Sequence, residues 1–216
     1  MRLGCFGCFA LAVVVLGILV VAGGVLFLST NILATPDIRP VPYSKADGYA
    51  AQQKLYEVYL RQSGRSSRKD PIVLTEREAN AFLSQHLSEV SGMPVTPLNL
   101  RFEQGQFLAQ GRMALRYLFQ GPPFAYVASY VPPRRLDQPV WVTVRGRIDI
   151  ENGGAQGAKR YGNVSVTELV LGRQPINGFL LYVMMGPSGA GLFRWPVPAV
   201  VEAVQFESGE ALIRTR

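Results

Sequence analysis

The N-terminal segment constrains this chain most, because it is long and carries no charge. No Asp, Glu, Lys or Arg occurs from Leu3 to Pro36, and Leu11 to Leu28 is almost wholly apolar. A helix needs about 20 apolar residues to cross the hydrocarbon core of a bilayer. The sequence therefore predicts a membrane anchor over residues 1–34, followed by a domain that is held at a membrane.

A cleaved secretory signal is the alternative interpretation of the same segment. Ala34 offers a cleavage position, but Ile32 fits poorly two residues before it. The apolar core of a signal is usually only about 7–15 residues, and this stretch is longer. We therefore expect an uncleaved single-pass anchor. Arg2 on one side nearly balances Arg39 and Lys45 on the other, so the orientation rests on the very short head, which favours an internal N-terminus. The domain would then lie outside the cytoplasmic membrane.

The chain is basic, with 22 Lys and Arg against 15 Asp and Glu in 216 residues. Positive charge beside a bilayer attracts anionic head groups, and nucleic acid is the other usual partner. Only Arg61, Arg65, Arg68 and Lys69 cluster, and no aromatic residue interleaves with them. We interpret that cluster as a solvated loop and expect no nucleic-acid partner. A second basic site, Pro132-Pro133-Arg134-Arg135, has two open interpretations: a corner that docks on phosphate head groups, or a plain solvated turn.

The sequence offers little catalytic chemistry. Cys5 and Cys8 lie at the edge of the apolar run, which makes a thiolate metal site in the domain impossible. His86 is the only histidine, so a Ser-His arrangement has one available position. Asp149 and Glu151 at a strand end could pair as acid and base, although solvated hairpin charges are far more common. We expect a protein that is not an enzyme and that uses no cofactor and no metal.

Beyond the anchor, the pattern predicts an extended spacer over 35–43, with three prolines, and an α+β domain over 44–216. Ser44 and Asp47 form one predicted capping box, and Thr75 and Glu78 another that opens a helix ending at Gly92. From Pro97 onward, apolar residues alternate with polar ones in long hairpins. The expected fold is a curved antiparallel sheet with two or three helices packed against one face.

Four tyrosines accompany the first helix: Tyr43, Tyr49, Tyr56 and Tyr59. They either form a belt at the membrane interface or pack the helix on the domain, and we favour packing.

The candidate contact site is a short segment that is apolar nearly all round, Gly178 to Met185, together with the run 192–195. Eight residues are too few to span a bilayer, whereas flexible methionines suit an adaptable contact surface. Trp195 either anchors at the head groups or packs under the sheet, with packing slightly favoured. The residues expected to contact lipid or a partner protein are Phe179, Leu180, Tyr182, Val183, Met184, Met185, Phe193 and Trp195.

The segment Leu74-Thr75-Glu76-Arg77-Glu78-Ala79-Asn80-Ala81-Phe82-Leu83, with the long alternating strands and the terminal Gly-turn hairpin, resembles YpmS-like bacterial envelope proteins. More broadly, residues 70–216 are similar to membrane-anchored lipid-binding domains such as LmeA and the tubular lipid-binding group. The resemblance implies a lipid-binding fold and assigns no individual residues. We therefore expect an envelope protein that binds lipid or a lipid-linked molecule. The alternative is a structural or assembly module that binds another envelope protein.

Overall fold

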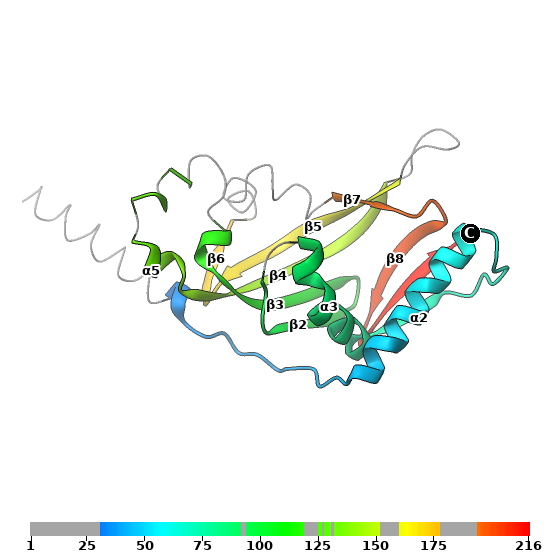
Figure 1. Cartoon of the computed structure of the whole chain (residues 1–216), viewed down its shortest axis with the longest axis horizontal. Coiled ribbons are helices and arrows are strands. Elements are labelled where there is room, and N and C mark those ends of the chain that lie inside the picture. Colours follow the sequence, from blue (N-terminus) through cyan, green and yellow to red (C-terminus); the bar gives the residue numbers. More distant parts are fainter. Residues whose placement is uncertain are drawn as a thin grey trace, which may run out of the picture.

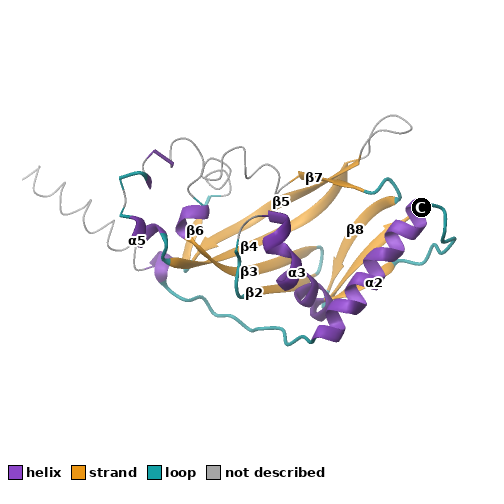
Figure 2. Ribbon diagram, viewed as in Figure 1, coloured by secondary structure: helices purple, strands orange, loops and turns teal. Residues whose placement is uncertain are grey.

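Two antiparallel sheets and two long helices make up the domain in a computed structural model, which describes residues 31–91, 94–118, 125–126, 128–130, 132–151, 160–177 and 194–216. Figure 1 shows an elongated molecule, with the large sheet running along its length and the small sheet and helix α2 at one end. Figure 2 shows that both long helices lie at the half of the molecule that holds the small sheet. The expected α+β class with a curved antiparallel sheet is confirmed.

The large sheet has the strand order β2-β3-β4-β5-β6, and β7 also pairs with β5. Its strands are β2 (Leu98–Glu103), β3 (Gln106–Ala114), β4 (Pro139–Glu151), β5 (Arg160–Leu171), β6 (Gln174–Ile176) and β7 (Arg194–Val197). A register shift between Arg145 and Gly146 interrupts the long β4–β5 ladder. Such a bulge bends a strand and increases its twist, which fits the curvature in Figure 1.

The small sheet has the order β1-β9-β8 and joins distant parts of the chain. It consists of β1 (Ile72–Thr75), β8 (Val201–Glu207) and β9 (Glu210–Thr215). The C-terminal hairpin therefore pairs with a strand that begins at residue 72, as Ile72 opposite Ile213 shows.

Both predicted capping boxes are present. Helix α2 (Lys45–Gln62) begins after Ser44, whose hydroxyl accepts from Asp47 N while the Asp47 carboxylate accepts from Ser44 N. Helix α3 (Glu76–Ser91) begins with the same exchange between Thr75 and Glu78. Each box satisfies amide groups that have no partner inside the helix, so the local sequence sets both starting points.

Helix α3 also covers one edge of the large sheet, where β2 is the outermost strand. Asn80 has no exposed surface, and its side chain accepts from Leu100 N and donates to Leu100 O, both at 2.7 Å. Glu76 Oε1 accepts from Phe102 N at 2.7 Å. Four residues of a helix rise about 6 Å, and two residues of a strand extend about 6.6 Å. The spacing between the side chains of Glu76 and Asn80 therefore matches the spacing between the backbone groups of Phe102 and Leu100. The unpaired edge of β2 is thereby closed.

The expected packing of the tyrosines is wrong. Tyr49, Tyr56 and Tyr59 are 66%, 55% and 56% exposed, and Tyr43 is 45% exposed. The buried face of α2 instead carries Gly48, Ala51, Val58 and Arg61. A side-chain carbon added at Gly48 would lie 3.6 Å from Ala81 Cβ, so small residues let α2 and α3 approach closely and the large rings remain outside.

The prediction that Arg61 belongs to a solvated basic loop is also wrong. Its side chain is 2% exposed. Nη1 donates to Thr215 Oγ1 and to Asp70 O, both at 2.7 Å, and Nε donates to Glu57. Buried arginines need such partners. Arg61 thus ties the end of α2 to the last strand, while Arg65, Arg68 and Lys69 are exposed as expected.

The Pro-rich segment 35–43 is extended and lies against the polar face of the large sheet. The buried pair Asn99 and Gln110 holds it: Asn99 accepts from Val41 N and donates to Arg39 O, and Gln110 donates to Asp37 O. Strand alternation places Asn99 on the face opposite Leu98 and Leu100, and the extended segment buries it on that face.

The predicted anchor falls almost entirely on residues 1–30, outside the described part, so it remains a prediction. Within the described residues, no helix is long and apolar enough to cross a membrane. Residues 31–34, at the end of the predicted anchor, lie in the described part. Asn31 O accepts from Arg173 N at 2.9 Å, and Ile32 packs on the core cluster around Leu118 and Val140. The chain therefore enters the domain at the end of the large sheet where β5 turns into β6.

Candidate functional site

An apolar groove lies between the two sheets, at the end of the domain that carries α2. Its cavity volume is about 320 Å³ and it is partly open to solvent. Ligand pockets usually measure about 300–1,000 Å³, so the groove has room for a small apolar ligand or one part of a larger one. The lining residues are Leu55, Val58, Tyr59, Gln62, Ile148, Ile150, Trp195, Val197, Pro198, Val201, Val204 and Ile213.

Strand alternation explains why apolar side chains converge here. Ile148 and Ile150 are two residues apart on β4 and therefore point to the same face. Val204 on β8 is the register partner of Ile213 on β9, which places these two side chains side by side on the small sheet. The groove is the space where these two apolar faces diverge, and Leu55 from α2 lies along it.

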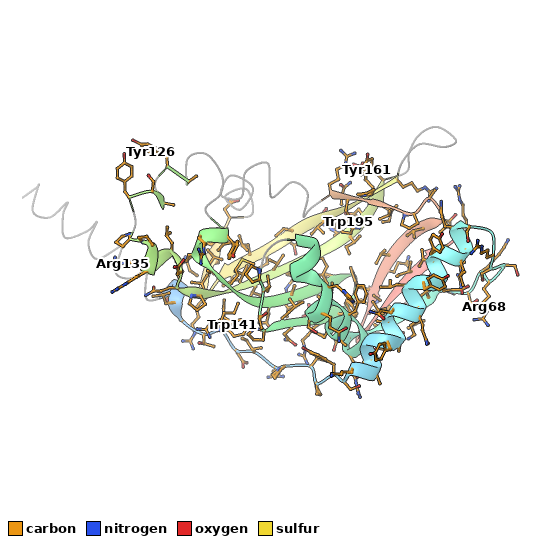
Figure 3. The ribbon with its side chains drawn as sticks, viewed as in Figure 1. Arg68, Tyr126, Arg135, Trp141, Tyr161 and Trp195 are labelled. Atoms are coloured by element: carbon orange, nitrogen blue, oxygen red, sulfur yellow. The ribbon has the colours of Figure 1, made fainter. Side chains whose placement is uncertain are left out.

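Trp195 reaches the groove from β7 because its neighbour on β5 has no side chain. Gly162 is the register partner of Trp195, and a carbon added at Gly162 would lie 3.0 Å from Trp195 Cε2. The indole therefore lies against Gly162, and Figure 3 labels Trp195 beside β7. Of the two interpretations of Trp195, packing under the sheet fits this position.

The strand also places a charged neighbour outside the groove. Arg194 stacks over the Tyr161 ring at 4.3 Å and pairs with Glu151 at 2.8 Å. Hydrogen bonds from Asn163 and Arg194 lower the pKa of Glu151. These charges belong to the solvated rim.

No charged side chain lines the groove among the described residues. The polar side-chain groups of its lining residues are the Tyr59 hydroxyl, the Gln62 amide and the Trp195 indole N–H. Gln62 Oε1 already accepts from Val200 N at 3.0 Å. A charged ligand would lose its hydration here without gaining partners. The groove therefore favours an aliphatic ligand, whose burial contributes about 0.8 kcal/mol per methylene group.

A separate polar pair links the two long helices. Lys54 Nζ lies 2.6 Å from Glu78 Oε1, across the α2–α3 contact. Burial opposes ionisation of Glu78, but the hydrogen bonds from Lys54 and Thr75 outweigh it and lower the pKa of this carboxyl. The pair joins the two helices beside the capping box and does not face the groove.

The residues considered for catalysis are dispersed. His86 lies 3.0 Å from Gln52 and against the Phe82 ring. Asp149 accepts from Ser165 at 3.0 Å on an exposed strand position. Among the described residues, no three His, Cys, Asp or Glu side chains come close enough to hold a metal ion.

Of the eight residues that the sequence nominated, Trp195 alone lies in the described part, and it lines the groove. Phe179, Leu180, Tyr182, Val183, Met184, Met185 and Phe193 lie outside the described residues. Sequence reasoning assigned Ile148, Ile150 and Val204 to strands but not to a site. Apolar alternation is the only signal that they carry, and it does not distinguish a filled core from an open groove.

No protein-family model matches this chain, and no curated protein matches it.

Proposed function

We propose that this protein is a membrane-anchored, non-enzymatic envelope protein whose domain holds the acyl chain of a lipid or lipid-linked molecule in the groove. The observation that carries the proposal is an open cavity of about 320 Å³ that Ile148, Ile150, Trp195 and Leu55 line without any charge. Such a surface contributes free energy to ligand binding chiefly through the burial of apolar area. The resemblance to YpmS-like and LmeA-like proteins points the same way.

The test uses the two tryptophans of the chain, Trp141 and Trp195, as separate reporters. The Trp141→Phe variant leaves the groove tryptophan as the only emitter, and the Trp195→Phe variant leaves Trp141. The full chain is reconstituted in vesicles that contain a phospholipid with bromine atoms on its acyl chain. Bromine quenches an indole only at contact, so we expect quenching of Trp195 emission and much weaker quenching of Trp141.

A matched pair of substitutions on α2 separates groove occupancy from general membrane contact. Leu55→Lys brings a charge to the groove lining and should abolish quenching of Trp195. Tyr49→Lys introduces the same charge on the exposed face of the same helix and should leave it unchanged. Equal quenching in both variants, or none in the unmodified chain, would refute acyl-chain binding.

The anchor is tested separately. In intact cells, a membrane-impermeant maleimide should label a cysteine introduced at Ser67, an exposed position of the domain. The same reagent should not reach Cys5 and Cys8. Release of the domain from the membrane fraction would instead support the cleaved-signal alternative.

A second function has one observation in its favour. Tyr49, Tyr56 and Tyr59 form an exposed aromatic surface on α2, and Tyr56 stacks on Tyr59 with ring centroids 5.8 Å apart. Tyrosine is enriched at protein interfaces, so this face suits an assembly module that binds another envelope protein. Photo-crosslinking from position 56 in membranes should then capture one defined protein, and Tyr49→Ala with Tyr59→Ala should abolish the adduct.

A further inference from the structure

The end of the large sheet opposite the groove carries a concentrated positive charge. The 3₁₀ turn η1 (Leu115–Tyr117) follows β3, the short helix α5 (Pro133–Leu136) precedes β4, and the β5–β6 turn lies beside both. Together they carry Arg116, Arg134, Arg135 and Arg173, against the single carboxylate of Asp137. We name these four arginines, with Tyr126 and Tyr130, the basic end.

The backbone of the basic end is well connected. Leu115 N donates to Gln138 O at 3.2 Å, and Arg116 pairs with Asp137 at 3.1 Å, which links η1 to α5. Arg134 and Arg135 occupy the helical turn of α5 and are exposed. The Pro-Pro sequence thus begins a helical turn that presents two adjacent guanidinium groups to solvent. Guanidinium groups are suited to bidentate contact with phosphate.

Two exposed aromatic side chains accompany these arginines. Tyr126 and Tyr130 are 68% and 73% exposed, and their hydroxyl groups are 2.8 Å apart. Rings with an apolar body and a polar tip favour the head-group level of a bilayer. Figure 3 shows Tyr126 and Arg135 at the same end of the molecule and Arg68 at the opposite end.

The chain enters the domain beside the basic end. Asn31, the first described residue, is held there because its carbonyl accepts from Arg173 N, and Arg173 Nε donates to Thr35 O at 3.2 Å. The thirty residues that precede Asn31 include the apolar stretch Leu11 to Leu28. If that stretch crosses the bilayer, the basic end lies at the membrane surface.

We propose that the basic end is a docking surface for a bilayer that contains anionic phospholipids, with Arg134 and Arg135 contacting lipid phosphates and Tyr126 and Tyr130 at head-group depth. This inference rests on the anchor in the proposed function, but it does not depend on an occupied groove. Docking at this end holds the long axis of the domain away from the membrane plane.

The groove then lies far from the bilayer. β4 runs from Pro139, next to the basic end, to Ile150 in the groove lining. At about 3.3 Å per residue, this length is about 35 Å. One leaflet of the hydrocarbon core is only about 15 Å thick. An acyl chain in the groove therefore belongs to a lipid that has left the anchoring membrane, which places the domain in lipid transfer or reception.

The test uses the full chain, with Cys5 and Cys8 changed to serine and a single fluorescent label on a cysteine at Ser129, between the two tyrosines. A matched protein carries the label at Ser67, in the basic loop at the other end. Both are reconstituted in phosphatidylcholine vesicles with and without about one-third phosphatidylglycerol, and a head-group spin-labelled lipid serves as quencher. We expect quenching at position 129 in the anionic vesicles, weaker quenching without phosphatidylglycerol, and none at position 67.

Charge substitutions provide the decisive comparison. Each arginine at an anionic surface contributes about a fivefold preference, so Arg134→Gln with Arg135→Gln should lower the ratio of docked to undocked protein about 30-fold. Arg65→Gln with Arg68→Gln removes the same charge at the far end and should change nothing. The proposal would be overturned if quenching at position 129 were unchanged by Arg134→Gln with Arg135→Gln, or if quenching at position 67 were equal to it.

The two proposals fail in different ways. An empty groove abolishes the bromine quenching of Trp195 and leaves the label at position 129 quenched. A missing anchor shows as loss of flotation with vesicles of phosphatidylcholine alone.

Discussion

The contact between Asn80 and the edge of β2 gives the sharpest test of the fold. The Asn80 side chain has no exposed surface and makes three hydrogen bonds, to Glu76 O, Leu100 O and Leu100 N, each at 2.7 Å. Asn80→Ala leaves the N–H and C=O of Leu100 without these partners. An unpaired buried backbone group costs about 1–3 kcal/mol, so two such groups cost about 2–6 kcal/mol. Because β2 is an edge strand and water can reach it after a small rearrangement, we expect about 3 kcal/mol.

Pulse proteolysis of the full chain in urea measures this difference as a shift in the free energy of unfolding of the domain. Asn80→Asp keeps the acceptor for Leu100 N but turns a negative charge toward two carbonyl oxygens. It should therefore be at least as destabilising at neutral pH and recover partly on acidification. Ser84→Ala, on the same helix, removes one part-buried hydrogen bond from an exposed residue to Ala81 O and should cost less than about 0.5 kcal/mol. If Asn80→Ala also cost less than that, the closure of the β2 edge by α3 would be refuted.

Two further predictions concern the helix pair and the groove. The pKa of Glu78 is lowered in the folded protein, so its ionised carboxylate stabilises the fold at pH values above its ordinary pKa of 4.5. This stability is lost as the pH falls through the lowered pKa. Urea titrations across this range should show a shallower loss of stability with falling pH for Glu78→Gln than for the unmodified chain. Gly162→Val introduces a branched side chain where a single added carbon would lie 3.0 Å from the Trp195 indole, and it should shift the emission of Trp195 in the Trp141→Phe background. Ser67→Val, at an exposed position of the domain, should not. Unchanged emission in Gly162→Val would contradict the stacking of Trp195 on that glycine.

The helix starts were predictable because capping is a local interaction. Ser44 with Asp47 and Thr75 with Glu78 are each three residues apart, so the sequence contains both partners of every bond that starts the helix. The hairpin from Leu98 to Ala114 was predictable for the same reason, since a two-residue turn joins strands of clear alternation. Errors arose where a distant segment changed the environment. The strand pattern alone indicates that Asn99 faces solvent, whereas in the structure the segment 35–43 covers it.

The role of Glu76 shows the same limit within a motif that was otherwise identified. A carboxylate at its position in the first turn of α3 is compatible with a role in helix entry, as for Glu78. The structure instead assigns it to the edge strand, where it accepts from Phe102 N. A carboxylate in a first turn suits both roles, and only the placement of β2 decides between them.

The candidate groove was not predictable as a site. Its lining comes from α2, β4, β7, β8 and β9, and each contributes side chains that would equally suit a closed core. Trp195 was nominated for its residue type, and the room it occupies depends on Gly162, its partner across the ladder and 33 positions earlier in the chain.

The sequence alone determined the features that depend on neighbouring residues: the apolar N-terminal stretch, the helix starts, the alternation of the strands and the excess of positive charge. Tertiary structure decided which face of each element is covered, because that depends on segments brought together from opposite ends of the chain. It buried Arg61 against Thr215 and left the α2 tyrosines exposed. It also separated the groove from the basic end along the length of β4. Burial and relative position are properties of the packed chain, and no local pattern contains them.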